Sequence, residues 1–162
     1  MTTRYCEDNK LVELELTRSE ADAVAVVCRS LVCESHKAKM FAHSMDAACI
    51  QGGLKPPDAS WECSAKHDDG SKLTIPEALH ADTADVKAEY SDTDGVELSM
   101  SPQMAMILSC IVGNEYSSHL NNLFRGLTKL AIVESLRADV QWSDVIEGAY
   151  TLTPVSGKEH SS

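Results

Sequence analysis

Two stretches of the chain share one pattern of apolar and polar positions. Residues 11–16 and 96–100 alternate between apolar and polar side chains, as a strand with one buried face does. Each is followed by a hydroxyl side chain and then by apolar positions at helical spacing. The hydroxyls belong to Thr17, which opens the capping box Thr17-x-x-Glu20, and to Ser101, which is followed by proline. The sequence therefore predicts a strand and a helix at both places.

The two stretches correspond to each other residue by residue at an offset of 84. The matching positions are Val12 and Val96, Glu13 and Glu97, Leu14 and Leu98, Thr17 and Ser101, Ala21 and Ala105, Val24 and Leu108, and Val27 and Ile111. Further matches follow at an offset of 83: Ser35 and Ser118, His36 and His119, and Phe41 and Phe124. Upstream, Tyr5 and Tyr90 each lie in a short strand that a polar loop separates from the next strand, which predicts two β-hairpins. We interpret the chain as a tandem duplication.

Each copy is expected to contain two helices. The first helix runs over residues 18–32 and 102–112, and the second begins at the serine–histidine pair and continues to residue 51 or residue 133. Ser35 and Ser118 are the expected N-caps of the second helices. The last of these helices is apolar over more than one face, which is typical of a helix buried by several neighbours. It is expected at the contact between the copies or in a homodimer interface.

A tryptophan-containing segment follows the second helix. In the first copy, Trp61–Ala65 and Leu73–Ile75 alternate on either side of an Asp-Asp-Gly turn, which predicts a further hairpin. The second copy repeats parts of this segment in the same order, with Trp142 and Thr151–Pro154. Residues 155–162 are expected to form a frayed tail.

The fold class that follows is α+β. A ββαα(β) module is made twice, by residues 1–84 and 85–162, and antiparallel strands form one layer and helices the other. Copies of this size are marginal for an independent core, so the two are expected to share one interface as an intramolecular pseudo-dimer.

The charge of the chain limits its partners. The sequence has 14 Lys+Arg and 25 Asp+Glu, a formal net charge of −11. Such a surface repels phosphate, which argues against direct nucleic-acid binding, and attracts basic protein surfaces. The alternative is a solvated surface that only keeps the protein soluble. No apolar run is long enough to cross a bilayer and residues 1–10 lack a signal-peptide core, so a cytoplasmic location without membrane contact is expected.

The six cysteines are expected to be free thiols in such a compartment. Cys28, Cys49 and Cys110 lie within apolar helical patterns, where cysteine acts as a small apolar side chain. Together with Cys33 and His36, the first two offer the ligand types of zinc. Their spacing is not that of a zinc finger, and no CxxC is present, so no metal site and no cofactor are predicted.

Two sets of residues are candidates for a binding site. His36 and His119 lie at matching helix starts and, with Trp61 and Trp142, would line a pocket between the copies for a nucleotide-like ligand. The alternative is that both histidines lie on the surface and that the duplicated aromatic rings organise the core.

The second set is acidic. Asp92, Asp94 and Glu97 lie on the second predicted hairpin and are candidate contacts for a basic protein surface. The Asp-x-Asp-Gly sequence there resembles part of a calcium loop but lacks its final glutamate, so it is interpreted as a turn. No nucleophile elbow, Walker loop, dinucleotide fingerprint or H-E-x-x-H motif is present, which makes an enzyme the third alternative.

The strand followed by Leu16-Thr17-x-x-Glu20-Ala21 resembles the openings of many short phage or prophage proteins. The resemblance covers about ten residues and implies a setting, not an activity. The function expected from the sequence is that of an acidic, non-enzymatic binding protein, in its concrete form an inhibitor that occupies the basic nucleic-acid-binding surface of a host or defence enzyme. The alternative is a protein that binds or sequesters a nucleotide-like ligand at the interface between the copies.

Overall fold

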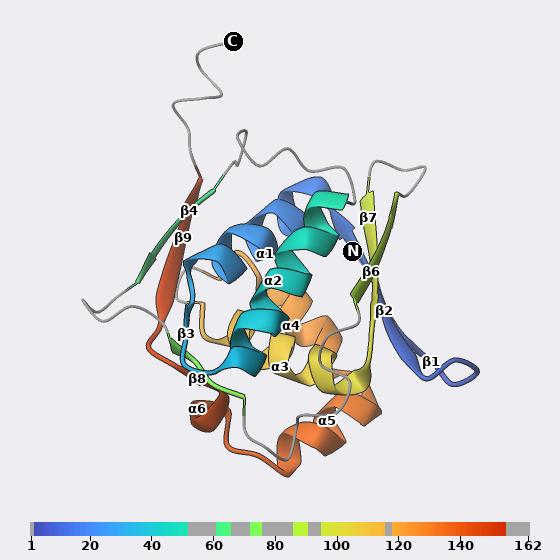
Figure 1. Cartoon of the computed structure of the whole chain (residues 1–162). Helices are drawn as coiled ribbons and strands as arrows, with labels where there is room; N and C mark the ends of the chain where they lie inside the picture. Colours follow the sequence, from blue (N-terminus) through green and yellow to red (C-terminus); the bar gives the residue numbers. More distant parts are fainter. Residues whose placement is uncertain are drawn as a thin grey trace.

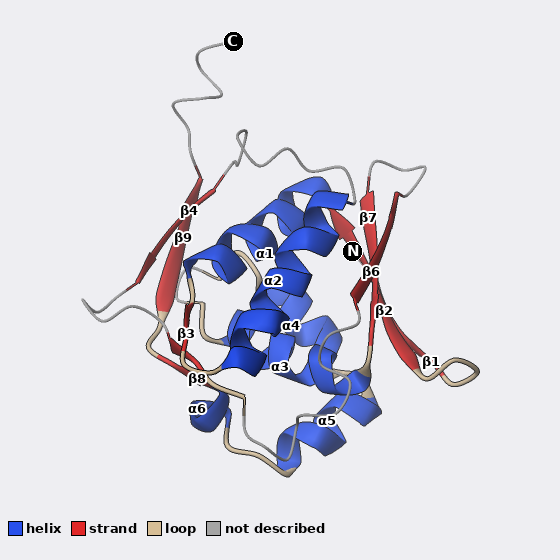
Figure 2. Cartoon of the chain, viewed as in Figure 1, coloured by secondary structure: helices blue, strands red, loops and turns tan. Residues whose placement is uncertain are grey.

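A computed structural model describes residues 2–51, 61–65, 72–75, 86–90, 95–115 and 118–154 (Figure 1). The strands are β1 (Thr2–Cys6), β2 (Leu11–Thr17), β3 (Val32–Cys33), β4 (Trp61–Ala65), β5 (Lys72–Leu73), β6 (Val86–Tyr90), β7 (Gly95–Met100), β8 (Ile146–Glu147) and β9 (Tyr150–Pro154). The helices are α1 (Arg18–Ser30), α2 (His36–Gln51), α3 (Pro102–Gly113), α4 (Asn121–Thr128), α5 (Ala131–Ala138) and α6 (Trp142–Val145). Figure 2 shows helices and small sheets in one body, which confirms the α+β class.

A four-stranded antiparallel sheet in the order β1-β2-β7-β6 contains both hairpins that the sequence predicts. Its central pair, β2 and β7, joins the N-terminal hairpin to the second one. In this pair Leu14 lies opposite Leu98, and both side chains are buried. A single hairpin is marginal in water, so the pairing of the two hairpins stabilises both.

The helices α1 and α3 begin as predicted. The Thr17 hydroxyl accepts from the Glu20 N–H at 3.1 Å, and the Glu20 carboxylate accepts from the Thr17 N–H at 2.9 Å, which completes the capping box. The Ser101 hydroxyl accepts from the Met104 N–H at 3.3 Å. Both helices are buried all round over their central residues, 21–28 and 104–112, and not on one face alone.

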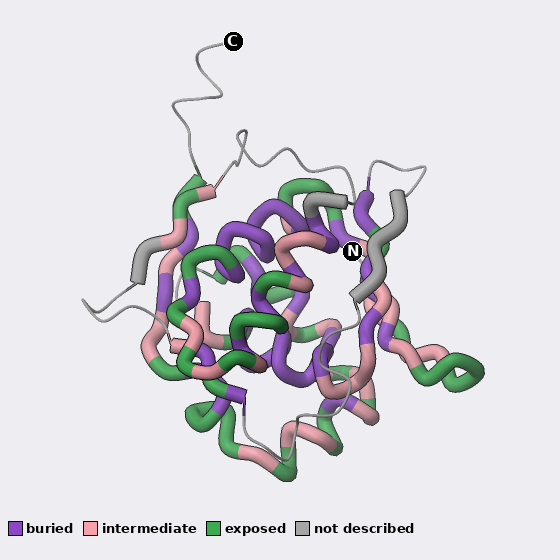
Figure 3. The backbone as a smooth tube through the Cα atoms, viewed as in Figure 1, coloured by how far each residue is buried: buried purple, intermediate pink, exposed green. Residues whose placement is uncertain are grey.

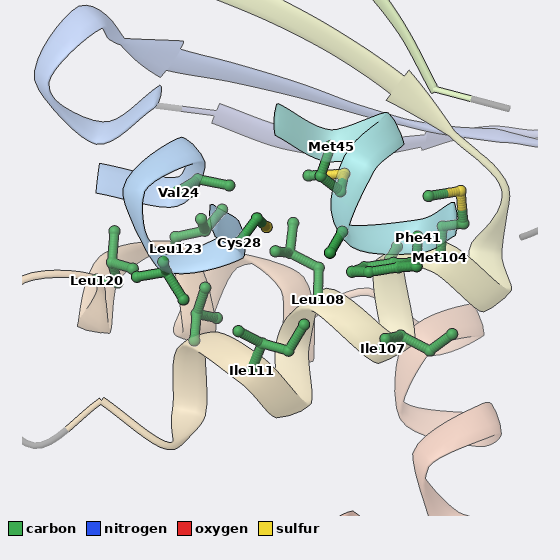
Figure 4. Packing of buried hydrophobic residues seen from close by; sticks show 14 of the residues in the cluster. Val24, Cys28, Phe41, Met45, Met104, Ile107, Leu108, Ile111, Leu120 and Leu123 are labelled. Carbon is green, nitrogen blue, oxygen red and sulfur yellow. The ribbon is translucent and has the colours of Figure 1, made fainter. Parts of the chain in front are cut away.

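Neighbouring elements on several sides explain this burial. Helix α1 packs on α2, on β4 and on the strands β2 and β7, and α3 packs on α4, α5, α6 and β2. Figure 3 shows the buried segments passing through the middle of the molecule. Figure 4 shows side chains of α1 and α2, such as Cys28 and Phe41, next to Leu108 of α3 and Leu123 of α4. The apolar residues of the early and late parts of the chain thus belong to one core.

The second helices lie across the junction of the two hairpins. Helix α2 packs on β6, and α4 packs on β1. The approach of α4 is close, because a Cβ atom at Gly126 would lie 2.8 Å from side-chain atoms of Thr3. Helix α4 therefore packs on the N-terminal hairpin, whereas α2 packs on the second hairpin.

The sequence prediction of one long helix over residues 118–133 is wrong. The chain forms α4 and α5 separately, and Leu130 between them is extended, with φ −75° and ψ 121°. The Thr128 hydroxyl donates to the Phe124 carbonyl at 2.9 Å in the last turn of α4. Because α4 and α5 both turn apolar residues towards the core, the apolar pattern continues across the break and conceals it.

The predicted hairpin of residues 61–75 is also wrong. Strand β4 pairs with β9, whereas β5 lies between β3 and β8, so the two expected hairpin strands belong to different sheets. Trp142, the expected counterpart of Trp61, begins a short helix and not a strand. The C-terminal strand replaces the local partner because it supplies the buried side chains of Tyr150 and Leu152, and the Tyr150 hydroxyl donates to the Ile111 carbonyl at 2.8 Å.

These additional strands alter the expected two-layer arrangement. They lie on the side of the helices away from the four-stranded sheet, so that helices lie between two groups of strands (Figure 1). All six cysteines are free, and Cys28, Cys49 and Cys110 are buried as predicted. In the described part of the chain, no helix has the length and apolar character needed to cross a membrane. The expected boundary at residue 84, the Asp-Asp-Gly turn and the C-terminal tail lie outside the described residues.

Candidate functional site

Glutamates line one face of the four-stranded sheet. Alternation along β2 and β7 buries the apolar side chains on the helix side: Val12, Leu14, Leu16, Val96, Leu98 and Met100. The opposite face presents Glu13, Glu15 and Glu97, which we call the glutamate face. Glu97 is exposed, and the other two are half-buried. No helix of the described residues covers this side of the sheet (Figure 1).

The register of the sheet places like charges opposite each other. Glu15 lies directly opposite Glu97 in the β2–β7 pair. Glu13 is instead compensated, because its carboxylate accepts from the Arg4 guanidinium at 2.9 Å. Like charges directly opposite in a sheet destabilise it. The pair formed by Glu15 and Glu97 is therefore a structural cost on an uncovered surface.

This face is hollowed. A depression of about 390 Å³ is lined by the glutamate face, Arg4, Asn9, Leu14, Leu98 and Ser99. Glu97, the described member of the acidic set expected from the sequence, lines it. The other two members, Asp92 and Asp94, lie outside the described residues. Glu13 and Glu15 were not singled out from the sequence, although alternation with the buried residues of β2 would have placed them on the same face as Glu97.

The two candidate histidines begin helices in different ways. His36 is exposed and is the first residue of α2, where the Ser35 hydroxyl caps the helix by accepting from the Ala38 N–H at 3.1 Å. Ser118 does not cap α4, contrary to the prediction, because it adopts a positive φ of 65°. The Glu115 carboxylate takes its place and accepts from the backbone N–H groups of His119 and Leu120, at 2.9 Å and 2.6 Å.

The structure brings two of the four expected ligand residues together. The rings of Trp61 and His119 lie 4.7 Å apart, centroid to centroid, and are tilted by 58°. The Trp61 indole N–H donates to the Ser19 carbonyl at 3.0 Å, which fixes the ring against the start of α1. Within the described residues, no ring contact or hydrogen bond joins His36 or Trp142 to this pair. The pair holds β4 and the start of α4 against α1.

Trp142 lies at a different site, which the sequence did not indicate. It is 53% exposed and lines two adjoining hollows that it shares with Arg137 and Cys110. Arg137 lies over the ring of Phe124, 5.3 Å from the centroid, and its Nη1 donates to the Ser109 hydroxyl at 2.9 Å. The available signal was the spacing: Arg137 follows the buried Val133 by four residues, so a charged group lies on the apolar side of α5.

The thiols do not form a metal site in the described residues. No group of three or more histidine, cysteine, aspartate or glutamate side chains there is arranged to hold a metal ion. Burial raises the pKa of the Cys49 thiol from 9.0 to about 12, and it raises the pKa of Cys28 well above its ordinary value. Both thiols therefore stay protonated at neutral pH, the form in which a cysteine is a poor nucleophile.

Comparison with protein-family models, with curated proteins and with solved structures finds no match to this chain.

Proposed function

We propose that this chain is an acidic binding protein that engages a basic surface of another protein through the glutamate face. The observation that carries the proposal is the placement of Glu15 directly opposite Glu97 on a sheet face that no described helix covers. The net charge of −11 also attracts basic partners over a long range.

The geometry accounts for the choice of a basic partner. A lysine or arginine side chain inserted above Glu15 and Glu97 would replace their repulsion by two attractive interactions. The hollow of about 390 Å³ leaves room for such a side chain next to both carboxylates. Arg4 forms its ion pair with Glu13 and attracts Glu97 only from a longer distance, so neither Glu15 nor Glu97 has a close ion-pair partner among the described residues. Complementary charge of this kind speeds association and fixes the register of the complex.

The concrete form of the proposal is an inhibitor of a host or defence enzyme, of the kind that phages encode. In this form the acidic face takes the place of nucleic-acid phosphates on the enzyme's basic surface. The excess of acidic over basic residues supports competition with phosphate, and it argues against binding nucleic acid directly. The phage setting of this proposal rests on the short resemblance of Leu16-Thr17-x-x-Glu20-Ala21 to the openings of phage or prophage proteins.

We further propose that the two hairpins and their helices arose by duplication and pack as a pseudo-dimer. An 84-residue shift carries the opposed pair Val12 and Met100 onto the opposed pair Val96 and Leu16, as a two-fold axis between β2 and β7 requires. The same operation exchanges the packing of α2 on β6 with that of α4 on β1. The correspondence ends after these elements, since α5 and α6 have no counterparts among the described residues of the first half.

Capture from cell lysate with matched variants tests the proposed function. The tagged wild-type chain is compared with the double variant Glu15→Gln/Glu97→Gln and with a control, Glu7→Gln/Glu62→Gln, which makes the same charge change at exposed positions elsewhere. The proposal expects a stoichiometric partner that the wild type and the control retain, that the sheet variant loses, and that high salt releases.

The captured protein then provides the second part of the test. If it binds nucleic acid, the wild-type chain should displace that nucleic acid and the sheet variant should not. Equal capture by all three chains would show that the glutamate face is not the binding surface.

A further inference from the structure

We propose that the hollow beside Arg137 and Trp142 binds a small planar carboxylic acid. The site consists of two adjoining depressions of about 190 Å³ and 240 Å³ that share Cys110, Arg137 and Trp142 in their walls. It is separate from the glutamate face, and none of its residues is used by the proposed protein-binding function.

Arg137 is held in place before any ligand arrives. Its side chain is 21% exposed, and its Nη1 donates to the buried Ser109 hydroxyl at 2.9 Å and to the Cys110 sulfur at 3.6 Å. The guanidinium lies over the Phe124 ring, with 5.3 Å between its central carbon and the ring centroid. A group fixed on two sides in this way loses little side-chain freedom when it binds a ligand.

The guanidinium still has donors to offer. On the Nε side, the Glu134 carboxylate lies 3.6 Å away and is itself more than half exposed. No described residue accepts a hydrogen bond from Nη2. Arginine binds carboxylates best through two parallel N–H groups. Nη2 and Nε supply such a pair, because the Glu134 oxygen at 3.6 Å from Nε is too distant for a hydrogen bond.

The walls of the site are suited to a flat ring. Trp142 is the most exposed large apolar side chain in the described chain, at 53%, and it borders both depressions. Phe124 and Gly113 line the smaller depression, and Ala138 and Val140 line the larger one. A planar ligand would stack on the indole while its acid group binds Arg137. In small-ligand sites, apolar walls usually bury the ligand and a few polar groups fix its orientation.

The charge of the site favours a ligand that carries a single negative charge. One guanidinium, partly neutralised by Glu134, balances one carboxylate but not a phosphate dianion, which the Glu134 carboxylate would repel more strongly. A neutral ring would lack the charge-assisted hydrogen bonds. The class of ligand is therefore an aromatic monocarboxylate and not a nucleotide.

The two tryptophans provide the assay. In the ¹⁵N-labelled chain each indole N–H gives one NMR signal, and the Trp61→Phe variant identifies which of the two belongs to Trp142. 2-Naphthoate is titrated into the chain, with 2-naphthamide as the neutral match of the same shape and AMP as the phosphate match. Trp61 serves as an internal control, because its indole N–H is hydrogen-bonded to Ser19 away from the hollow.

The proposal expects 2-naphthoate to shift the Trp142 signal saturably, with a Kd on the order of 1 mM or tighter for a ligand of this size. The Trp61 signal should stay in place. Binding by 2-naphthamide and AMP should be at least fivefold weaker. Equal shifts with the acid and the amide, or tighter binding of AMP, would overturn the assignment.

Variants locate the acid group. Arg137→Lys keeps the charge but removes the planar fork, and it should weaken 2-naphthoate binding at least fivefold while the unchanged Trp61 signal reports an intact fold. Glu134→Gln should tighten binding by about two- to fivefold, the scale of an exposed ion pair, whereas the exposed Glu7→Gln should change nothing. Unaltered binding in Arg137→Lys, or weaker binding in Glu134→Gln, would contradict the proposed role of Arg137.

Discussion

Replacing Glu97 by glutamine should make the folded protein more stable. The Cβ atoms of residues directly opposite in an antiparallel pair lie about 4.5–5.5 Å apart, and Glu15 and Glu97 stand in that relation. Two unit charges about 5 Å apart repel by about 0.8 kcal/mol in water, and dissolved salt lowers this value. We therefore expect the free energy of unfolding to rise by about 0.5–1 kcal/mol at low salt, or by about 1–4 °C in Tm for a protein of this size.

A double-mutant cycle isolates this interaction. Urea unfolding at pH 7 is measured for the wild type, Glu15→Gln, Glu97→Gln and the double variant. Either single change removes the repulsion, so the double variant should gain little beyond a single one, with a non-additivity of about 0.5–1 kcal/mol. The gain should shrink in high salt. Glu62→Gln is the matched control, because Glu62 is an exposed strand glutamate that lies opposite Thr153.

Single variants that are no more stable than the wild type, with Glu62→Gln equally neutral, would show that Glu15 and Glu97 do not destabilise the sheet. Gains that simply add would show that the two carboxylates act independently of each other. A Glu15 or Glu97 variant that is more stable but no longer captures a partner would show that the repulsion between the two carboxylates serves binding and lowers stability.

Three further predictions concern the core and the helix starts. The pKa of the Cys49 thiol in the folded chain is about 12, raised from 9.0, so the unfolded chain releases this proton at a lower pH. The contribution of this thiol to the free energy of unfolding is therefore complete below about pH 9 and should fall as the pH rises towards 12. Urea unfolding should show a loss of about 1.4 kcal/mol from this thiol between pH 8 and pH 10, which Cys49→Ala should abolish. Gly113→Ala would place a Cβ atom 2.6 Å from the Phe124 ring, so it should lower the free energy of unfolding, measured with urea, by about 1–3 kcal/mol. An increase in stability would contradict this close packing. Thr17→Ala should cost about 1 kcal/mol through loss of the capping box and Thr17→Ser almost nothing, and equal effects of the two would contradict the role of the hydroxyl.

The parts of the fold that the sequence predicted are those specified by local signals. Alternation with period two located the strands around Leu14 and Leu98, and hydroxyl caps at Thr17 and Ser101 located the starts of α1 and α3. These signals depend only on residues within a few positions of each other. They also identified the buried cysteines, because the apolar pattern around Cys28 corresponds to a buried helix.

The parts that were missed depend on distant partners. The Asp-Asp-Gly signal favoured a local hairpin, but β4 pairs with β9, nearly ninety positions later in the chain. The break between α4 and α5 was hidden because Leu127 and Val133 are buried on both sides of it. The sequence predicts a helix cap at Ser118, whereas the carboxylate of Glu115 accepts the backbone N–H groups there, from outside the expected pattern.

For the candidate sites, too, local signals were predicted from the sequence and contacts between distant residues were not. Alternation along β7 placed Glu97 on the exposed face, but only the pairing of β2 with β7 brought Glu15 opposite to it. Matching positions in the sequence suggested one pocket for two histidines and two tryptophans. The structure joins only Trp61 to His119, and it places Trp142 beside Arg137 instead.

The decisive measurement is where the partner binds on the folded chain. The ¹⁵N-labelled chain is titrated with the partner captured from lysate, and the backbone NMR signals that change are mapped onto the structure. The account predicts changes centred on Glu13, Glu15, Glu97 and Ser99, and their loss in the Glu15→Gln/Glu97→Gln variant. Changes centred on Arg137 and Trp142, with the signals of β2 and β7 unmoved, would contradict it.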